Sequence, residues 1–220
     1  MSPQYPLDMH LLFILVLVAN ILVSWKGFKD AHFFNRYAFD LSAIKQGQHW
    51  RMWTCGWLHV DLQHLIFNMF TLYFFAPIVI QTLGGVAFIA GYAGSLYAGS
   101  WLSYQVHKNQ YAYQAVGASG AVTGILYTSI ALYPDMQLGI MFIPIPVSAY
   151  WVGFFYMVYT FYGVVKNNDR IGHTAHFGGA VFGLILPLVL APKIVEQHLG
   201  PVTLMLLPVV VFFIWAFKRR

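Results

Sequence analysis

Long apolar runs, separated by short polar stretches, fill most of this sequence. A helix that crosses a bilayer needs about 20 mostly apolar residues. We therefore expect seven spanning helices, at about 9–25, 57–82, 86–106, 119–133, 147–166, 173–190 and 202–217. Only 9% of the residues are charged, whereas an ordinary soluble domain carries roughly a quarter. The sequence thus predicts an all-α, multi-pass protein whose surroundings are the lipid bilayer.

Length and charge limit the number of domains and the kinds of partner that this chain can have. The 220 residues leave room for a single membrane domain, 1–220, without a sizeable soluble module. Its net charge of +5 lies mainly in short loops, which suits anionic lipid headgroups better than nucleic acid. The first apolar run lacks a basic leader, so we expect a retained helix and no cleaved signal peptide. The single Cys55 excludes an intramolecular disulfide.

Polar side chains inside the spans are the best guide to function, because each is unfavourable in hydrocarbon unless it is paired. Near the starts of spans two, four and six lie His59, His64, Asn68, Ser119, His173 and His176. These three spans start from the same side of the membrane. With His64 about two turns into its span, we expect it, Ser119 and His176 at one level, roughly 10 Å below the surface.

Glycines predict how two of these spans meet. Gly120 and Gly124 follow Ser119, and Gly179 and Gly183 follow His176, each pair four residues apart and so on one helical face. Such small-residue ridges allow helices to pack backbone to backbone in lipid. A contact between spans four and six would bring the histidine within hydrogen-bond reach of the serine.

These residues suit serine protease chemistry. A serine becomes nucleophilic when a neighbouring base takes its proton, and histidine is a suitable base at neutral pH. We therefore predict Ser119 as nucleophile and His176 as general base, in a dyad without an acidic third member. The backbone N–H of Ser119, the ring of His64 and the amide of Asn68 are candidate oxyanion donors.

A metal site is the competing interpretation of the histidines. His173 and His176 have the i, i+3 spacing of a ligand pair, but no cysteine or carboxylate completes the set in this sequence. We expect neither a metal nor another cofactor. His59 is predicted to lie near the interface and to order the adjoining loop.

Taken in order along the chain, these motifs resemble the rhomboid intramembrane serine proteases. The resemblance covers about residues 8–192 and rests on four signals: Trp50-Arg51, His59-x4-His64-x3-Asn68, Gly117-x-Ser119-Gly120 and Ala175-His176-x2-Gly179-x3-Gly183. It implies a six-helix core, with an extra C-terminal span at 202–217. It also implies the roles given above for Ser119, His176, His64 and Asn68, a structural role for Arg51, and transmembrane proteins as substrates.

The resemblance has two departures. Many relatives carry a tyrosine four residues after the nucleophile, where its ring packs on the catalytic histidine, and here that position is Thr123. Many also carry a glutamate near the end of span two, where this chain has Gln81.

Two other functions compete with proteolysis. One is an inactive rhomboid-like protein that binds membrane clients, although such proteins characteristically lose the serine or the histidine. The other is a channel or transporter, which would need polar residues across the whole span, whereas spans four and six become apolar after their first turns.

Orientation is predicted in opposite ways by two signals. The loops after spans one, three and five and the C-terminus lie on the same face as the predicted site and hold 11 of the 12 Lys and Arg residues. The positive-inside rule alone would place this face in the cytoplasm. The family pattern instead puts the catalytic face outside. We follow the family and expect a bacterial inner membrane, with the active site opening to the extracytoplasmic side.

Overall fold

The chain folds as a bundle of long helices. The computed structural model describes residues 7–140, 143–166 and 171–218. Within these ranges the long helices are α1 (Leu7–Lys29), α5 (Leu62–Leu83), α6 (Gly85–His107), α7 (Ser119–Leu132), α8 (Ala149–Lys166), α9 (His173–Leu190) and α11 (Leu199–Lys218). Each corresponds to one expected span, so the all-α, multi-pass fold is confirmed.

The start of α5 differs from the expectation. The expected span began at residue 57, but Cys55–Trp57 form a short 3-10 helix, η1, and α5 begins only at Leu62. The cause is a helix cap: the Asp61 carboxylate accepts the backbone N–H of His64 at 2.7 Å. His64 therefore lies in the first turn of its helix, so its expected place two turns in is wrong.

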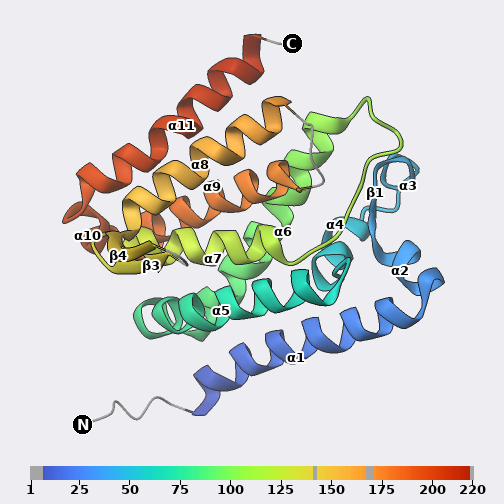
Figure 1. Ribbon diagram of the computed structural model, residues 1–220, viewed down its shortest axis with the longest axis horizontal. Coiled ribbons are helices and arrows are strands. Elements are labelled where there is room, and N and C mark those ends of the chain that lie inside the picture. The colour runs from blue at the N-terminus through green and yellow to red at the C-terminus, as the bar shows by residue number, and fades with distance from the viewer. Residues whose placement is uncertain (1–6, 141–142, 167–170, 219–220) are drawn as a thin grey trace.

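The centre of the bundle is formed by α6, α7 and α9. In Figure 1, α7 and α9 run side by side, with α1 at one edge of the molecule and α11 at the other. From Gly120 to Leu132, α7 is buried at nearly every position. Glycines permit this close packing: a Cβ on Gly178 would lie 2.7 Å from the Ala98 carbonyl oxygen of α6, closer than such atoms approach.

The outer helices present apolar side chains to their surroundings. Four helices in the described ranges are long and apolar enough to cross a bilayer, over Leu11–Lys29, Leu62–Leu83, His173–Leu190 and Leu199–Ala216. On α1, α5, α8 and α11 many large apolar side chains are exposed, among them Leu22, Phe70, Phe155 and Ile214. A water-soluble protein rarely exposes so continuous an apolar surface, so these faces contact lipid.

A compact loop region closes one end of the bundle. It contains α2 (Ala31–Tyr37), β1 (Phe39–Asp40), α3 (Leu41–Lys45), α4 (Arg51–Thr54) and η1. Strand β1 pairs antiparallel with β2 (Gln114–Ala115), which lies just before α7. The loop that follows α1 is thus joined directly to the segment that leads into Ser119.

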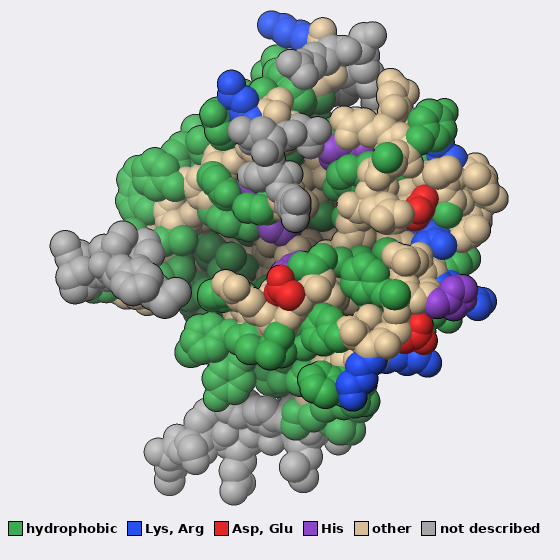
Figure 2. All heavy atoms as spheres, turned by 45° about the vertical axis from the view of Figure 1, so that its right-hand side comes forward, with side chains coloured by type: hydrophobic (Ala, Val, Ile, Leu, Met, Phe, Trp, Pro, Cys, Tyr) green, Lys and Arg blue, Asp and Glu red, His purple; other side chains and the backbone are tan. Residues whose placement is uncertain are grey.

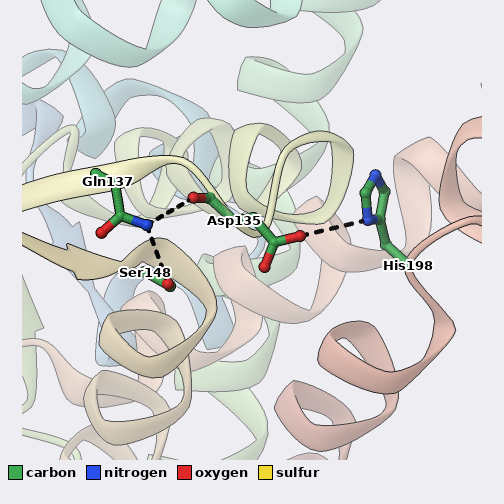
Figure 3. A network of polar contacts seen from close by, with 4 residues as sticks. All are labelled: Asp135, Gln137, Ser148 and His198. Atoms are coloured by element: carbon green, nitrogen blue, oxygen red, sulfur yellow. Dashed lines mark hydrogen bonds and ion pairs between the residues drawn. The ribbon is translucent and has the colours of Figure 1, made fainter.

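A short hairpin closes the opposite end. Strands β3 (Gln137–Ile140) and β4 (Ile143–Ser148) pair antiparallel between α7 and α8. Figure 3 shows the Gln137 amide between the Asp135 carbonyl and the Ser148 hydroxyl, at 2.9 and 3.1 Å. The Asp135 carboxylate faces the His198 ring at 3.8 Å, which links the hairpin to the segment between α10 (Pro192–Glu196) and α11.

Candidate active site

The predicted site residues come from helices that begin at the same end of the bundle. In Figure 1, α5, α7 and α9 all begin at the right-hand end, next to the loop region. Ser119 opens α7, His64 lies in the first turn of α5, and His176 lies in the first turn of α9. All three side chains are partly exposed. Figure 2, turned toward this end, shows histidine side chains in a hollow of the surface.

Gly117 brings His64 and Ser119 together. A Cβ at this position would lie 2.6 Å from Cε1 of His64 and 3.5 Å from the Ser119 hydroxyl oxygen. Its φ of +135° also lies in the region that favours glycine. The Gly117 N–H donates to the Cys55 carbonyl at 3.0 Å. The site therefore requires a residue without a side chain here, in a loop fixed to η1.

The backbones of α7 and α9 are in direct contact, as the glycine spacing predicts. A Cβ on Gly179 would overlap the Gly120 carbonyl, and one on Gly183 would overlap the Gly124 carbonyl. The Thr128 hydroxyl lies 2.9 Å from the Gly124 carbonyl oxygen and 3.0 Å from that of Gly183, and joins the two helices.

This contact continues to the helix starts, where Ser119 and His176 lie. A Cβ on Gly120 would be 3.1 Å from the Ala175 carbonyl oxygen, so the residues next to Ser119 and His176 in sequence already touch. Ser119 and His176 thus lie at neighbouring positions at the starts of α7 and α9.

Tyr156 of α8 makes a contact with His176 that the sequence did not predict. Its hydroxyl lies 3.0 Å from Nδ1 of His176, and the two rings are nearly parallel, with centroids 6.3 Å apart. The side chains of Thr123 and Thr160 lie close to the same hydroxyl. Tyr156, from another helix, thus contacts His176 through its hydroxyl on the side where Thr123 lies.

His59 fixes the segment that precedes Ser119. It is fully buried in the loop between η1 and α5, and its Nε2 accepts the Ala118 N–H at 3.4 Å. Its Nδ1 then carries the proton and donates to the Ser24 hydroxyl at 2.8 Å, which donates to the Trp57 carbonyl at 3.0 Å. Burial, and secondarily the neighbouring His64, lower the pKa of His59 to about 3. His59 is therefore neutral and holds α1, η1 and α7 together.

The amide of Asn68 lies on the same face of α5 as His64. It is buried and donates one N–H to the His64 carbonyl at 3.0 Å, which leaves its second N–H for another acceptor.

Arg51 lies away from these side chains. Its guanidinium donates to the Asn35 and Ala38 carbonyls, both at 2.8 Å, and to Gln48 at 2.7 Å. It thus links parts of the loop region to one another.

His173 lies beside His176, with ring centroids 6.4 Å apart, and packs against α8. Its ring packs against Tyr159, with centroids 5.2 Å apart, and against Gly163 of α8. Across the described ranges, no three side chains of metal-ligating type gather into a group.

Comparison with known proteins decides the family. The sequence model of one family, the Rhomboid domain, matches residues 46–193. The chain belongs to the rhomboid family. It is 28% identical over 188 residues to RHOMBOID-like protein 12, mitochondrial, of Arabidopsis thaliana, covering 78% of this chain and 55% of that protein. It is 34% identical over 98 residues to the putative rhomboid protease YdcA of Bacillus subtilis, covering 44% and 48%.

This rhomboid chain spans about half the length of these relatives. The presenilin-associated rhomboid-like protein, mitochondrial, of Mus musculus is also similar, at 29% identity over 142 residues, covering 57% of this chain and 34% of that protein. Several relatives are thus named as mitochondrial, so the expected bacterial inner membrane is not supported. The comparisons and the apolar helices support a multi-pass membrane protein.

Proposed function

We propose that this rhomboid-family chain is an intramembrane serine endopeptidase, with Ser119 as nucleophile and His176 as general base. The observation that carries the proposal is the meeting of Ser119, His64 and His176 at one end of the bundle, where α7 and α9 touch through glycine backbones. This arrangement combines a nucleophile, a base and a helix N-terminus in one partly open hollow.

The reaction would proceed in two halves. Ser119 Oγ attacks the carbonyl carbon of the scissile bond, and its proton passes to Nε2 of His176. The negative charge on the carbonyl oxygen is stabilised by the backbone N–H of Ser119, the His64 ring and the free N–H of Asn68. His176 then protonates the leaving amine as the C–N bond breaks. A water molecule, deprotonated by His176, then attacks the ester carbon, and His176 returns the proton to Ser119 Oγ as the bond between the acyl carbon and Oγ breaks.

The substrates we propose are transmembrane proteins, cut within or near the bilayer. Ser119 lies at the start of a helix inside an apolar bundle. A peptide embedded in the bilayer reaches this position more readily than a soluble peptide does. We further propose that the hollow opens to the extracytoplasmic side. In a Cys55→Ser background, a cysteine at Tyr111 should react with an impermeant maleimide from that side and one at Gly139 should not; the reverse result would contradict this orientation.

Cleavage of a model transmembrane substrate in liposomes tests the proposal. Ser119→Ala and His176→Ala should each abolish cleavage, because each removes a reacting group. Ser129→Ala, which changes a serine three turns further along α7, is the control and should retain most of the activity. If the purified wild-type chain binds such substrates but never cuts them, it is an inactive, client-binding member of the family and the proposal fails.

A further inference from the structure

A histidine that acts as a base must present an unprotonated Nε2 to the serine. Neutral imidazole carries its proton on either nitrogen, and only the Nδ1–H form leaves Nε2 free to accept the Ser119 proton. In serine proteases a hydrogen-bond acceptor at Nδ1 selects that form and orients the ring. The group at Nδ1 of His176 therefore decides how much of the protein is ready to react.

The Tyr156 hydroxyl occupies that position, 3.0 Å from Nδ1 of His176. A phenol oxygen can accept the Nδ1 proton if its own proton goes elsewhere. The side chains of Thr123 and Thr160, which both lie close to the same hydroxyl, offer such an acceptor. In this arrangement the His176 Nδ1–H donates to the Tyr156 oxygen, and the Tyr156 hydroxyl donates to one of the two threonines.

The packing of α8 holds Tyr156 in this place. On the site side of Tyr156, Gly163 lies directly against the His173 ring of α9. On the other side, the Tyr127 hydroxyl of α7 donates to the Gly153 carbonyl at 2.5 Å. Behind α8, Met205 of α11 lies 2.9 Å from where a Cβ on Gly153 would be. The extra C-terminal helix thus braces the helix that carries Tyr156.

From this geometry we propose that Tyr156 is a positioning residue for the Ser119–His176 pair. Its hydroxyl accepts the Nδ1 proton of His176 at the edge of the imidazole, so that Nε2 faces Ser119 as a base. The same hydrogen bond strengthens when His176 becomes an imidazolium, because its donor is then charged. This inference rests on the proposed function, since it assigns a role within that site.

Tyr156→Phe is the informative variant, because it keeps the ring and removes only the hydroxyl. Loss of a hydrogen bond to a charged group predicts a fall in kcat of about ten- to a hundredfold, with KM unchanged. Labelling of Ser119 by a small fluorophosphonate should slow by a similar factor, since that reaction needs the same base but no substrate contacts. Tyr162→Phe, on an exposed position of the same helix, should change neither.

Two results would overturn the inference while leaving the proposed function intact. One is wild-type kcat and labelling in Tyr156→Phe. The other is faster labelling, which would mean that the hydroxyl donates to Nδ1 and holds the unproductive tautomer. Failure of the proposed function is a separate result, namely full activity in Ser119→Ala or none in the wild type.

A measurement on the unchanged protein covers the case in which Tyr156→Phe does not fold. The ¹⁵N chemical shifts of His176, assigned by comparison with His176→Gln, distinguish a protonated Nδ1 from a protonated Nε2. The inference predicts the Nδ1–H form at neutral pH. A predominant Nε2–H form would contradict it.

Discussion

The backbone contact between α7 and α9 makes Gly179→Ala a severe test of how the site is assembled. A Cβ on Gly179 would overlap the carbonyl oxygen of Gly120, which cannot rotate away because it belongs to a helix. Restoring an ordinary carbon–oxygen separation of about 3.3–3.6 Å requires α9 to move away from α7 by more than about 1 Å.

The expected magnitude follows from two opposing terms. Overpacking of a well-packed core costs typically about 1–3 kcal/mol, and a contact with backbone lies at the upper end. Alanine gains about 1 kcal/mol over glycine in a helix interior. The net loss is therefore about 2 kcal/mol of stability. Because a displacement of about 1 Å in a reacting group can cost about a hundredfold in rate, kcat should fall by about that factor.

Thermal unfolding in detergent and substrate cleavage in liposomes measure the two effects. Gly200→Ala is the matched control, because nothing lies within 4 Å of a Cβ at that helical position; it should keep the wild-type rate and be no less stable. If Gly179→Ala unfolds at the wild-type temperature and cleaves at the wild-type rate, the α7–α9 backbone contact does not set the distance between Ser119 and His176.

Two further predictions concern side chains of the loop and of α5. His64→Ala and Asn68→Ala should each lower kcat by about a hundred- to a thousandfold with little change in KM; a raised KM with kcat intact would make that residue a substrate-binding one. His59→Phe should lower stability by about 1–3 kcal/mol, because the buried Ala118 N–H loses its acceptor. Since burial, with His64 second, depresses the pKa of His59 to about 3, the unfolded state binds this proton first, and stability should be lost as the pH falls from about 6.5 toward 3. If the melting temperature of His59→Phe depends on pH as that of the wild type does, protonation of His59 does not cause the loss of stability.

Much of the helical fold was predictable because lipid imposes length and composition on each span. The start of α9 at His173 and its end at Leu190 match the expectation. The start of α5 did not, because hydropathy could not separate the apolar residues of η1 from the helix that Asp61 caps. The β3–β4 hairpin was not predicted either, since its apolar, proline-containing strands resemble the approach to a helix.

The candidate site, too, was predictable only in part. The spacing of Gly179 and Gly183 predicted the contact with α7 because small residues at i, i+4 have one structural use in lipid. The contact of Tyr156 with His176 was not predictable. The chain has 14 tyrosines, and which of them lies level with His176 depends on how α8 packs. The division into a core at about 8–192 and an extra span at 202–217 stays a prediction, as do the catalytic roles.

The central claim is that Ser119 is a nucleophile activated by His176. Its most direct test is to treat the purified chain with a fluorophosphonate and to locate the adduct by mass spectrometry of its peptides. The claim predicts one modified residue, Ser119, in the wild type, and no adduct in His176→Ala at matched protein folding. Modification of another serine, or an unmodified Ser119 in a protein that still cleaves its substrate, would contradict the claim.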